Sequence, residues 1–139
     1  MTDVHMNPYL QFQDQTRDAM AFYQGVFGGE LTSQTFAEGG MSGHPSNDER
    51  IMHAQLVTPN GLVLMGSDVP DGVPYQPGSS IAISLSGDDE PTLRGYYEGL
   101  ADGGNVIEPL TEAPWGDIFG FCIDRFGTMW MVNIGSAPV

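Results

Sequence analysis

The sequence contains no lysine, and its only basic side chains besides histidine are four arginines. Asp and Glu together number 18, so the formal net charge is −14 at pH 7. Because binding to nucleic acid depends on cationic side chains that displace counterions from the phosphates, we expect no nucleic-acid partner. An anionic membrane surface is repelled for the same reason. The charge favours a cationic ligand instead.

Cysteine and long apolar runs are equally scarce. Cys122 is the only cysteine, which excludes an intrachain disulfide and argues against a cysteine-based zinc site. No apolar run approaches the ~20 residues of a membrane-spanning helix. The first residues lack the basic and then apolar pattern of a signal peptide, so we expect a cytoplasmic protein without a membrane partner.

One short sequence pattern occurs twice in this chain. "FYQGVFGGEL" begins at Phe22 and "YYEGLADGGNV" begins at Tyr96. In each copy apolar residues recur at i, i+3, i+4, i+7 and i+8, which predicts an amphipathic helix. The two stripes are Ala19, Phe22, Tyr23, Val26 and Phe27, and then Leu93, Tyr96, Tyr97, Leu100 and Ala101. A Gly-Gly pair ends each helix. The candidate N-caps are Asp14 or Thr16 for the first helix and Asp88 or Asp89 for the second, with Pro91 in its first turn.

The repeat extends to the segments around the helices. An apolar run precedes each helix, "PYLQF" (8–12) and "SIAISLS" (80–86), and short strands are expected at "ELTSQTF" and "NVIEPL". A hairpin then follows in each half, turning at "TPNG" in the first and at "DRFG" in the second. Each half therefore predicts the order strand, helix, strand and hairpin, which is βαβββ.

These elements predict an α+β fold of two βαββ modules in tandem within a single domain, residues 1–139. Module one covers about residues 5–68, a linker rich in Pro and Gly covers about 69–79, and module two covers about 80–135. One module alone buries its sheet and helix poorly. We expect the paired modules to form a curled mixed sheet around a cleft, the kind of place where small ligands bind.

Several stretches together resemble the vicinal oxygen chelate superfamily, which includes glyoxalase I, extradiol dioxygenases and bleomycin-resistance proteins. They are "YLQF", "FYQGVFGGEL", "IMHAQL", "LMGSD", "GGNVIEPL", "PWGDIFG" and "DRFGTMWMVN", and they span nearly the whole chain. The chain is most similar to the PhnB-like branch. The resemblance implies the glyoxalase/bleomycin resistance-like fold and a homodimer, because members commonly pair. Some PhnB-like proteins carry a methyltransferase label, which the Gly pairs do not support because they follow helices.

Metal-dependent members place His or Glu ligands on the first and last strands of each module. The matching positions in this chain are Pro8 (or Tyr9 or Asn7), Met65, Ser80 and Met131. None of these sets supplies the nitrogen and carboxylate ligands that Zn²⁺, Ni²⁺ or Fe²⁺ prefers. The three histidines, His5, His44 and His53, lack the spacing of a metal motif. We therefore expect no metal and no other cofactor.

His53 leads the candidates for ligand contact. Alternation in "IMHAQLVT" places His53 and Gln55 on one polar face of a strand. If Pro59-Asn60-Gly61 forms the hairpin loop, Gln55 pairs with Met65, whereas a loop one residue longer or shorter reverses the faces. Trp115, on a Pro-Gly loop, could close over a bound ring. The full set expected to line the cleft is Tyr9, Gln11, His53, Gln55, Met65, Ser67, Ser80, Trp115, Phe119, Met131 and Asn133.

Three functions remain open. The first is a metal-independent small-molecule-binding protein that holds a cationic or aromatic ligand in the cleft between the modules; the missing metal ligands and the acidic charge favour it. The second is an enzyme of the same superfamily, of lyase, isomerase or dioxygenase type, which uses His53 or a non-standard metal site. The third is a structural or regulatory protein that only dimerises. The sequence assigns no catalytic residue and does not identify the ligand.

Overall fold

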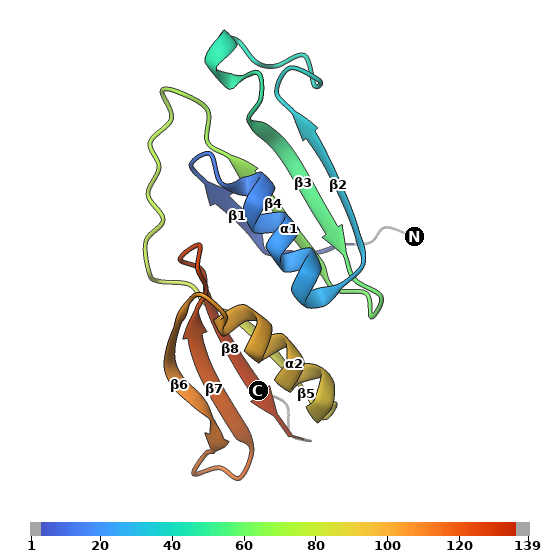
Figure 1. The fold of residues 1–139 in the computed structure, drawn as a ribbon, viewed down its shortest axis with the longest axis vertical. Helices are drawn as coiled ribbons and strands as arrows, with labels where there is room; N and C mark the ends of the chain where they lie inside the picture. Colours follow the sequence, from blue (N-terminus) through green and yellow to red (C-terminus); the bar gives the residue numbers. More distant parts are fainter. Residues whose placement is uncertain (1–3, 136–139) are drawn as a thin grey trace. The chain divides into compact units, whose positions relative to one another are not determined.

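The computed structural model describes residues 4–135 and contains the repeated order that the sequence predicts (Figure 1). The first half holds β1 (Tyr9–Phe12), α1 (Thr16–Phe27), β2 (Glu30–Thr35), the short 3-10 helix η1 (Pro45–Asn47), β3 (Ile51–Val57) and β4 (Val63–Asp68). The second half holds β5 (Ile83–Gly87), α2 (Glu90–Ala101), β6 (Asn105–Glu112), β7 (Ile118–Ile123) and β8 (Met129–Ile134). Neither α-helix in the described part of the chain has the length and apolar character that a membrane crossing requires.

Each half forms a four-stranded sheet of its own. The strand orders are β1-β4-β3-β2 and β5-β8-β7-β6, so the two sheets have the same topology. In each sheet the first strand is parallel to the last, and the other neighbours are antiparallel. The chain divides into two compact units between Pro77 and Gly78, within the linker expected at residues 69–79. The predicted α+β fold of two tandem modules is confirmed.

The repeated Gly-Gly pair has a steric cause that is the same in both modules. A Cβ on Gly29 would lie 2.1 Å from the carbonyl oxygen of Val57, and one on Gly104 would lie 2.2 Å from that of Ile123. Val57 and Ile123 are the last residues of β3 and β7, directly before the hairpin turns. The first glycine of each pair has a φ of 73° or 79°, which other residues rarely adopt. Each pair lets the chain leave its helix and cross closely over the end of the hairpin.

The helices cover one face of each sheet with a narrower stripe than the sequence predicts. Helix α1 buries Thr16, Ala19, Met20, Tyr23 and Phe27, and α2 buries Leu93, Tyr97 and Leu100. Phe22, Val26, Tyr96 and Ala101 are less buried than these. The core of each module lies between its helix and its sheet, because a helix on a flat face buries only the residues turned toward that face.

The two helices begin differently. Asp89 caps α2 by accepting a hydrogen bond from the Thr92 amide, as the sequence predicts. The prediction that Asp14 or Thr16 caps α1 is wrong, because the helix has no side-chain cap of that kind. The buried carboxylate of Asp68, at the end of β4, accepts from the Thr16 amide at 3.1 Å instead. Helix α1 is therefore fixed to its sheet by a distant residue.

Candidate functional site

The face of each sheet that does not carry the helix is called here the helix-free face. A Cβ on Gly66 would lie 3.4 Å from the Met20 sulfur of α1, and one on Gly120 would lie 2.8 Å from the Tyr97 ring of α2. The side-chain positions of Gly66 and Gly120 therefore lie on the faces that carry the helices. Because successive side chains of a strand alternate between faces, the neighbours of these glycines along each strand lie on the helix-free face.

In the first module the predicted register is confirmed. Gln55 pairs with Met65, and the Thr58 amide donates to the Leu62 carbonyl across the turn. The parallel strand β1 places Tyr9 beside Met65, which fixes the first-strand register that the sequence left open. The helix-free face holds Tyr9, Gln11, Thr32, Gln34, His53, Gln55, Met65 and Ser67. All six residues expected here come together, and the alternation of "ELTSQT" could have added Thr32 and Gln34.

Tyr9 and His53 form a pair on this face. The Tyr9 hydroxyl lies 3.2 Å from His53 Nδ1, and the ring centroids are 5.7 Å apart. Tyr9 is 45% exposed and His53 is half-buried. A phenol and an imidazole each donate and accept hydrogen bonds, so the pair can bind a polar group or carry a proton between its members.

The second module presents a different helix-free face. Met131 lies between Ser84 and Phe121, and Asn133 lies between Ser86 and Phe119, as the strand registers require. Ser80 is exposed and precedes β5, so it is not brought together with the others. The residue beside Met131 is Ser84, because the ladder with β8 begins only at Ile83. The apolar run beginning at Ser80 starts earlier than the strand does.

A hydrogen-bonded cluster connects the loop before β7 to this face. The indole N–H of Trp115 donates to Asn133 Oδ1 at 3.2 Å, and Asn133 Nδ2 donates to Asp117 Oδ2 at 3.0 Å. The Trp115 ring contacts Phe119 in a T-shaped arrangement with centroids 5.7 Å apart. Trp115 is 60% exposed, whereas Asn133 is 1% exposed. Three expected residues thus meet, and Asp117, next but one to Trp115, joins them.

The residues at the positions implied for a metal do not fit one. The strand registers place Tyr9 beside Met65 and Ser84 beside Met131. A phenol, a hydroxyl and two thioethers are not the nitrogen and carboxylate ligands that divalent zinc, nickel or iron prefers. Elsewhere in residues 4–135, no group of three or more His, Cys, Asp and Glu side chains is arranged to hold a metal ion.

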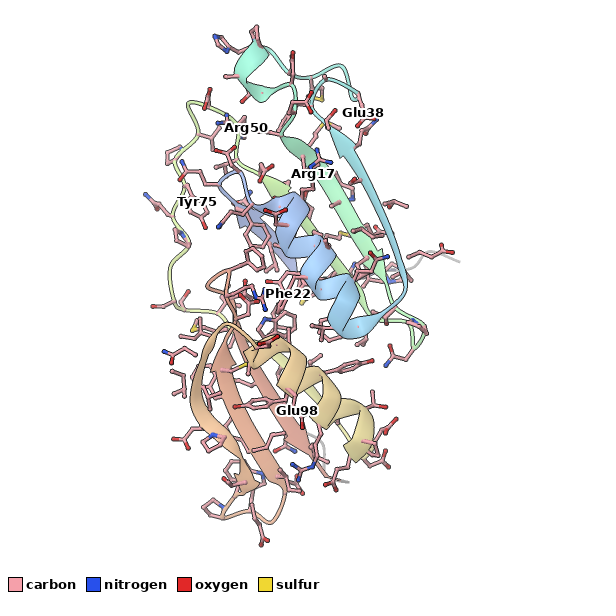
Figure 2. The ribbon with its side chains drawn as sticks, in the orientation of Figure 1. Arg17, Phe22, Glu38, Arg50, Tyr75 and Glu98 are labelled. Atoms are coloured by element: carbon pink, nitrogen blue, oxygen red, sulfur yellow. The ribbon has the colours of Figure 1, made fainter. Side chains whose placement is uncertain are left out.

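The other two histidines lie away from these faces. His5 is exposed ahead of β1, and His44 begins η1 with its Nδ1 accepting from the Ser46 amide at 3.1 Å. His44 lies in the segment between β2 and β3. Arg50, labelled in Figure 2, holds this region through ion pairs with Asp14 and Asp71, each at 2.6 Å.

The pKa values of Cys122 and Asp71 are shifted, each with a clear physical cause. Burial is the main cause that raises the pKa of the Cys122 thiol to about 11, and the nearby Asp124 carboxylate is the second. This thiol is therefore a poor nucleophile at neutral pH. Two hydrogen bonds lower the pKa of Asp71, the larger effect coming from Ser46 and the next from Arg50. Asp71 therefore keeps its charge and its ion pair with Arg50. Neither group lies on a helix-free face.

Comparison with known proteins places this geometry in a family. The chain is 28% identical to Protein YjdN of Escherichia coli (strain K12) over 140 residues, covering 93% of this chain and 94% of that protein. The crystal structure of protein PA1353 from Pseudomonas aeruginosa superposes with a TM-score of 0.80 at 35% identity, covering 97% of this chain and 100% of that one.

A PhnB protein from Bacillus cereus, whose description includes 3-demethylubiquinone-9 3-methyltransferase, has the same fold. It superposes with a TM-score of 0.72 at 21% identity, covering 95% of this chain and 100% of that one. The resemblance to PhnB-like proteins is therefore confirmed at the level of the fold. The model of the Glyoxalase/Bleomycin resistance protein/Dioxygenase superfamily matches residues 5–132. The chain belongs to the Glyoxalase/Bleomycin resistance protein/Dioxygenase superfamily.

Proposed function

We propose that this protein binds a small molecule without a metal, on the helix-free face of a module. One observation carries the proposal. The two modules agree where folding requires it, at the Gly-Gly pairs, the hairpin turns and the strand order. They differ at matched positions of the helix-free faces, where the first module has His53 and Gln55 and the second has Phe119 and Phe121.

A small-molecule site combines apolar walls with a few directed polar groups. The helix-free face of the first module has both, because Tyr9 and Met65 lie beside His53 and Gln55. Gln55 and His53 offer amide and imidazole groups, whereas Phe119 and Phe121 offer aromatic surface. Since folding alone does not require the two modules to diverge at these positions, a bound ligand is the simpler reason for the difference. The poor fit of Met65 and Met131 to a divalent metal supports the absence of metal chemistry.

An enzyme of the same superfamily is the second candidate, favoured by the Tyr9–His53 pair. Their 3.2 Å contact could let His53 act as a base and Tyr9 as its proton partner in an isomerase or lyase reaction. This candidate predicts turnover that is lost in His53→Gln. Binding without turnover instead predicts that this variant changes affinity and releases no product.

Native mass spectrometry of freshly purified, untagged protein tests the proposal. We expect a fraction of the chains to carry a small organic molecule that is lost on denaturation. Phe119→Ala, on the helix-free face, should lower that fraction at equal expression. The matched control is Val106→Ala, which removes an exposed side chain of β6 (48% exposed) opposite Cys122, on the helix side of the sheet, and should leave the fraction unchanged. About one metal ion per chain with no organic molecule would contradict the proposal.

A further inference from the structure

Trp115 combines two properties that usually exclude each other. Its side chain is 60% exposed, yet its position is fixed by a hydrogen bond to Asn133 and by the T-shaped contact with Phe119. An exposed indole contributes little to a core, and surface tryptophans are concentrated at recognition sites. Because the ring is held in place before any ligand arrives, binding to it requires little further ordering.

The loop beneath Trp115 is closed and fits tightly against its neighbours. The Ala113 amide donates to the Asp117 carbonyl at 2.7 Å, and Gly116 adopts a φ of 98° between Trp115 and Asp117. A Cβ on Gly135 would lie 2.1 Å from Asp117 Oδ1, so a glycine there leaves room for the carboxylate. The loop therefore fixes the indole and the carboxylate together, with Asn133 bonded to both.

This cluster has no counterpart in the first module. Both tryptophans of the chain, Trp115 and Trp130, lie in the second module, and the position matching Asn133 is occupied by Ser67. Since the first module forms the same sheet without such a cluster, the fold does not require it. Trp115 and Asp117 are therefore available for binding a ligand.

We propose that Trp115, Asp117 and Asn133 form a recognition site for a planar aromatic cation. The ring of the ligand would stack on the exposed indole, whose π face attracts positive charge. The Asp117 carboxylate, joined to the indole through Asn133, adds a fixed negative charge beside the stacking surface. The net charge of −14 raises the rate at which cations reach the protein. This inference rests on the proposed binding function and specifies its ligand class.

Nuclear magnetic resonance offers a direct test because the chain has only two indole N–H signals. The probes are N-methylquinolinium, a permanent planar cation, and quinoline, a ring of nearly the same shape that is neutral at pH 8. The cation should shift the Trp115 indole signal and bind about tenfold more tightly than quinoline, the range expected for a cation–π contact. Trp130 is buried and donates to Asp124 Oδ2 at 2.9 Å, so its signal should not move.

Three variants separate stacking from general charge. Trp115→Leu lacks this indole, so its readout is the side-chain amide of Asn133, whose saturable shifts with the cation should be abolished. Asp117→Asn keeps an acceptor for Asn133 and should weaken the cation about fivefold without changing the affinity for quinoline. Glu98→Gln is the matched control, since it removes one negative charge from an exposed position on α2, the helix on the other face of the sheet (Figure 2). Its affinity for the cation should equal that of the unmodified protein.

The results that overturn the inference are distinct from failure of the proposed function. Equal affinity for the two probes, or equal weakening by Asp117→Asn and Glu98→Gln, would exclude a charge-selective site at Trp115. A co-purified small molecule that shifts the Gln55 side-chain amide signals and leaves the Trp115 indole unmoved would also overturn it, while supporting ligand binding. One metal ion per chain without an organic ligand would instead overturn the proposed function.

Discussion

Replacing Asp68 should destabilise the protein strongly, because its buried carboxylate joins the start of α1 to the sheet. The carboxylate is 5% exposed and accepts three hydrogen bonds. Oδ1 accepts from the amide and the hydroxyl of Thr16, at 3.1 and 2.8 Å, and Oδ2 accepts from the Ile51 amide at 2.9 Å. These bonds connect the start of α1 to the start of β3.

The magnitude depends on the donors that a substitution leaves unpaired. A hydrogen bond to a charged acceptor contributes about 1.5–3 kcal/mol, and neighbouring contributions do not add fully. Asp68→Ala removes the acceptor of all three bonds from a buried place, so we expect a loss of about 3–5 kcal/mol in the free energy of unfolding. Asp68→Asn keeps one acceptor oxygen but turns an amide group toward another donor, so its loss should be about 2 kcal/mol.

Urea unfolding followed by circular dichroism measures both losses. The control is Asp71→Ala, which removes a largely exposed carboxylate and its ion pair with Arg50. Exposed ion pairs contribute little, so this variant should lose no more than about 1 kcal/mol. If Asp68→Ala and Asp71→Ala shift the midpoint equally, the buried carboxylate does not anchor α1 and the reasoning fails.

Four further predictions concern the repeat, the helix-free face and the thiol. Gly29→Ala should lose at least about 3 kcal/mol in thermal unfolding, because its Cβ would meet a backbone carbonyl and its φ is 101°. Gly25→Ala, in open space on α1, should gain about 0.5–1 kcal/mol, and equal effects would refute the steric argument. His53→Ala should lower the Tm by no more than about 4 °C; a collapse would make His53 a core residue. Cys122 should resist iodoacetamide at pH 8 until urea unfolds the chain, and fast labelling of the folded protein would contradict its burial. Because folding raises the pKa of this thiol from its ordinary value of 9.0 to about 11, the stability it contributes should be complete below pH 9 and decline as the pH rises toward 11.

Local signals in the sequence predict much of this fold. The two Gly-Gly pairs, the cap at Asp89 and the turn at Pro59-Asn60-Gly61 each depend on residues a few positions apart. The turn then fixes the register of β3 against β4, and with it the residues that share a face with His53. Local chemistry therefore suffices wherever a turn sets the pairing of the two strands that it joins.

The remaining features depend on partners far along the chain. Asp68 meets Thr16 across 52 residues, so no local signal in the sequence predicts that it anchors α1. Trp115 meets Asn133 across 18 residues, and no periodicity predicts that bond. The sequence places Ser80 beside Met131, whereas the structure places Ser84 there. An apolar run does not reveal at which residue the pairing of two strands begins. These contacts arise from topology rather than from local pattern.

Metal content tests the central claim most directly. The untagged protein would be purified without chelator, dialysed separately against Mn²⁺, Ni²⁺, Fe²⁺ and Zn²⁺, freed of loose ions by gel filtration and measured by elemental analysis. Because Tyr9, Met65, Ser84 and Met131 offer no suitable ligand set, we predict well below one bound metal ion per chain for every metal. One tightly held ion per chain for any of them would contradict the account of a metal-independent binding protein.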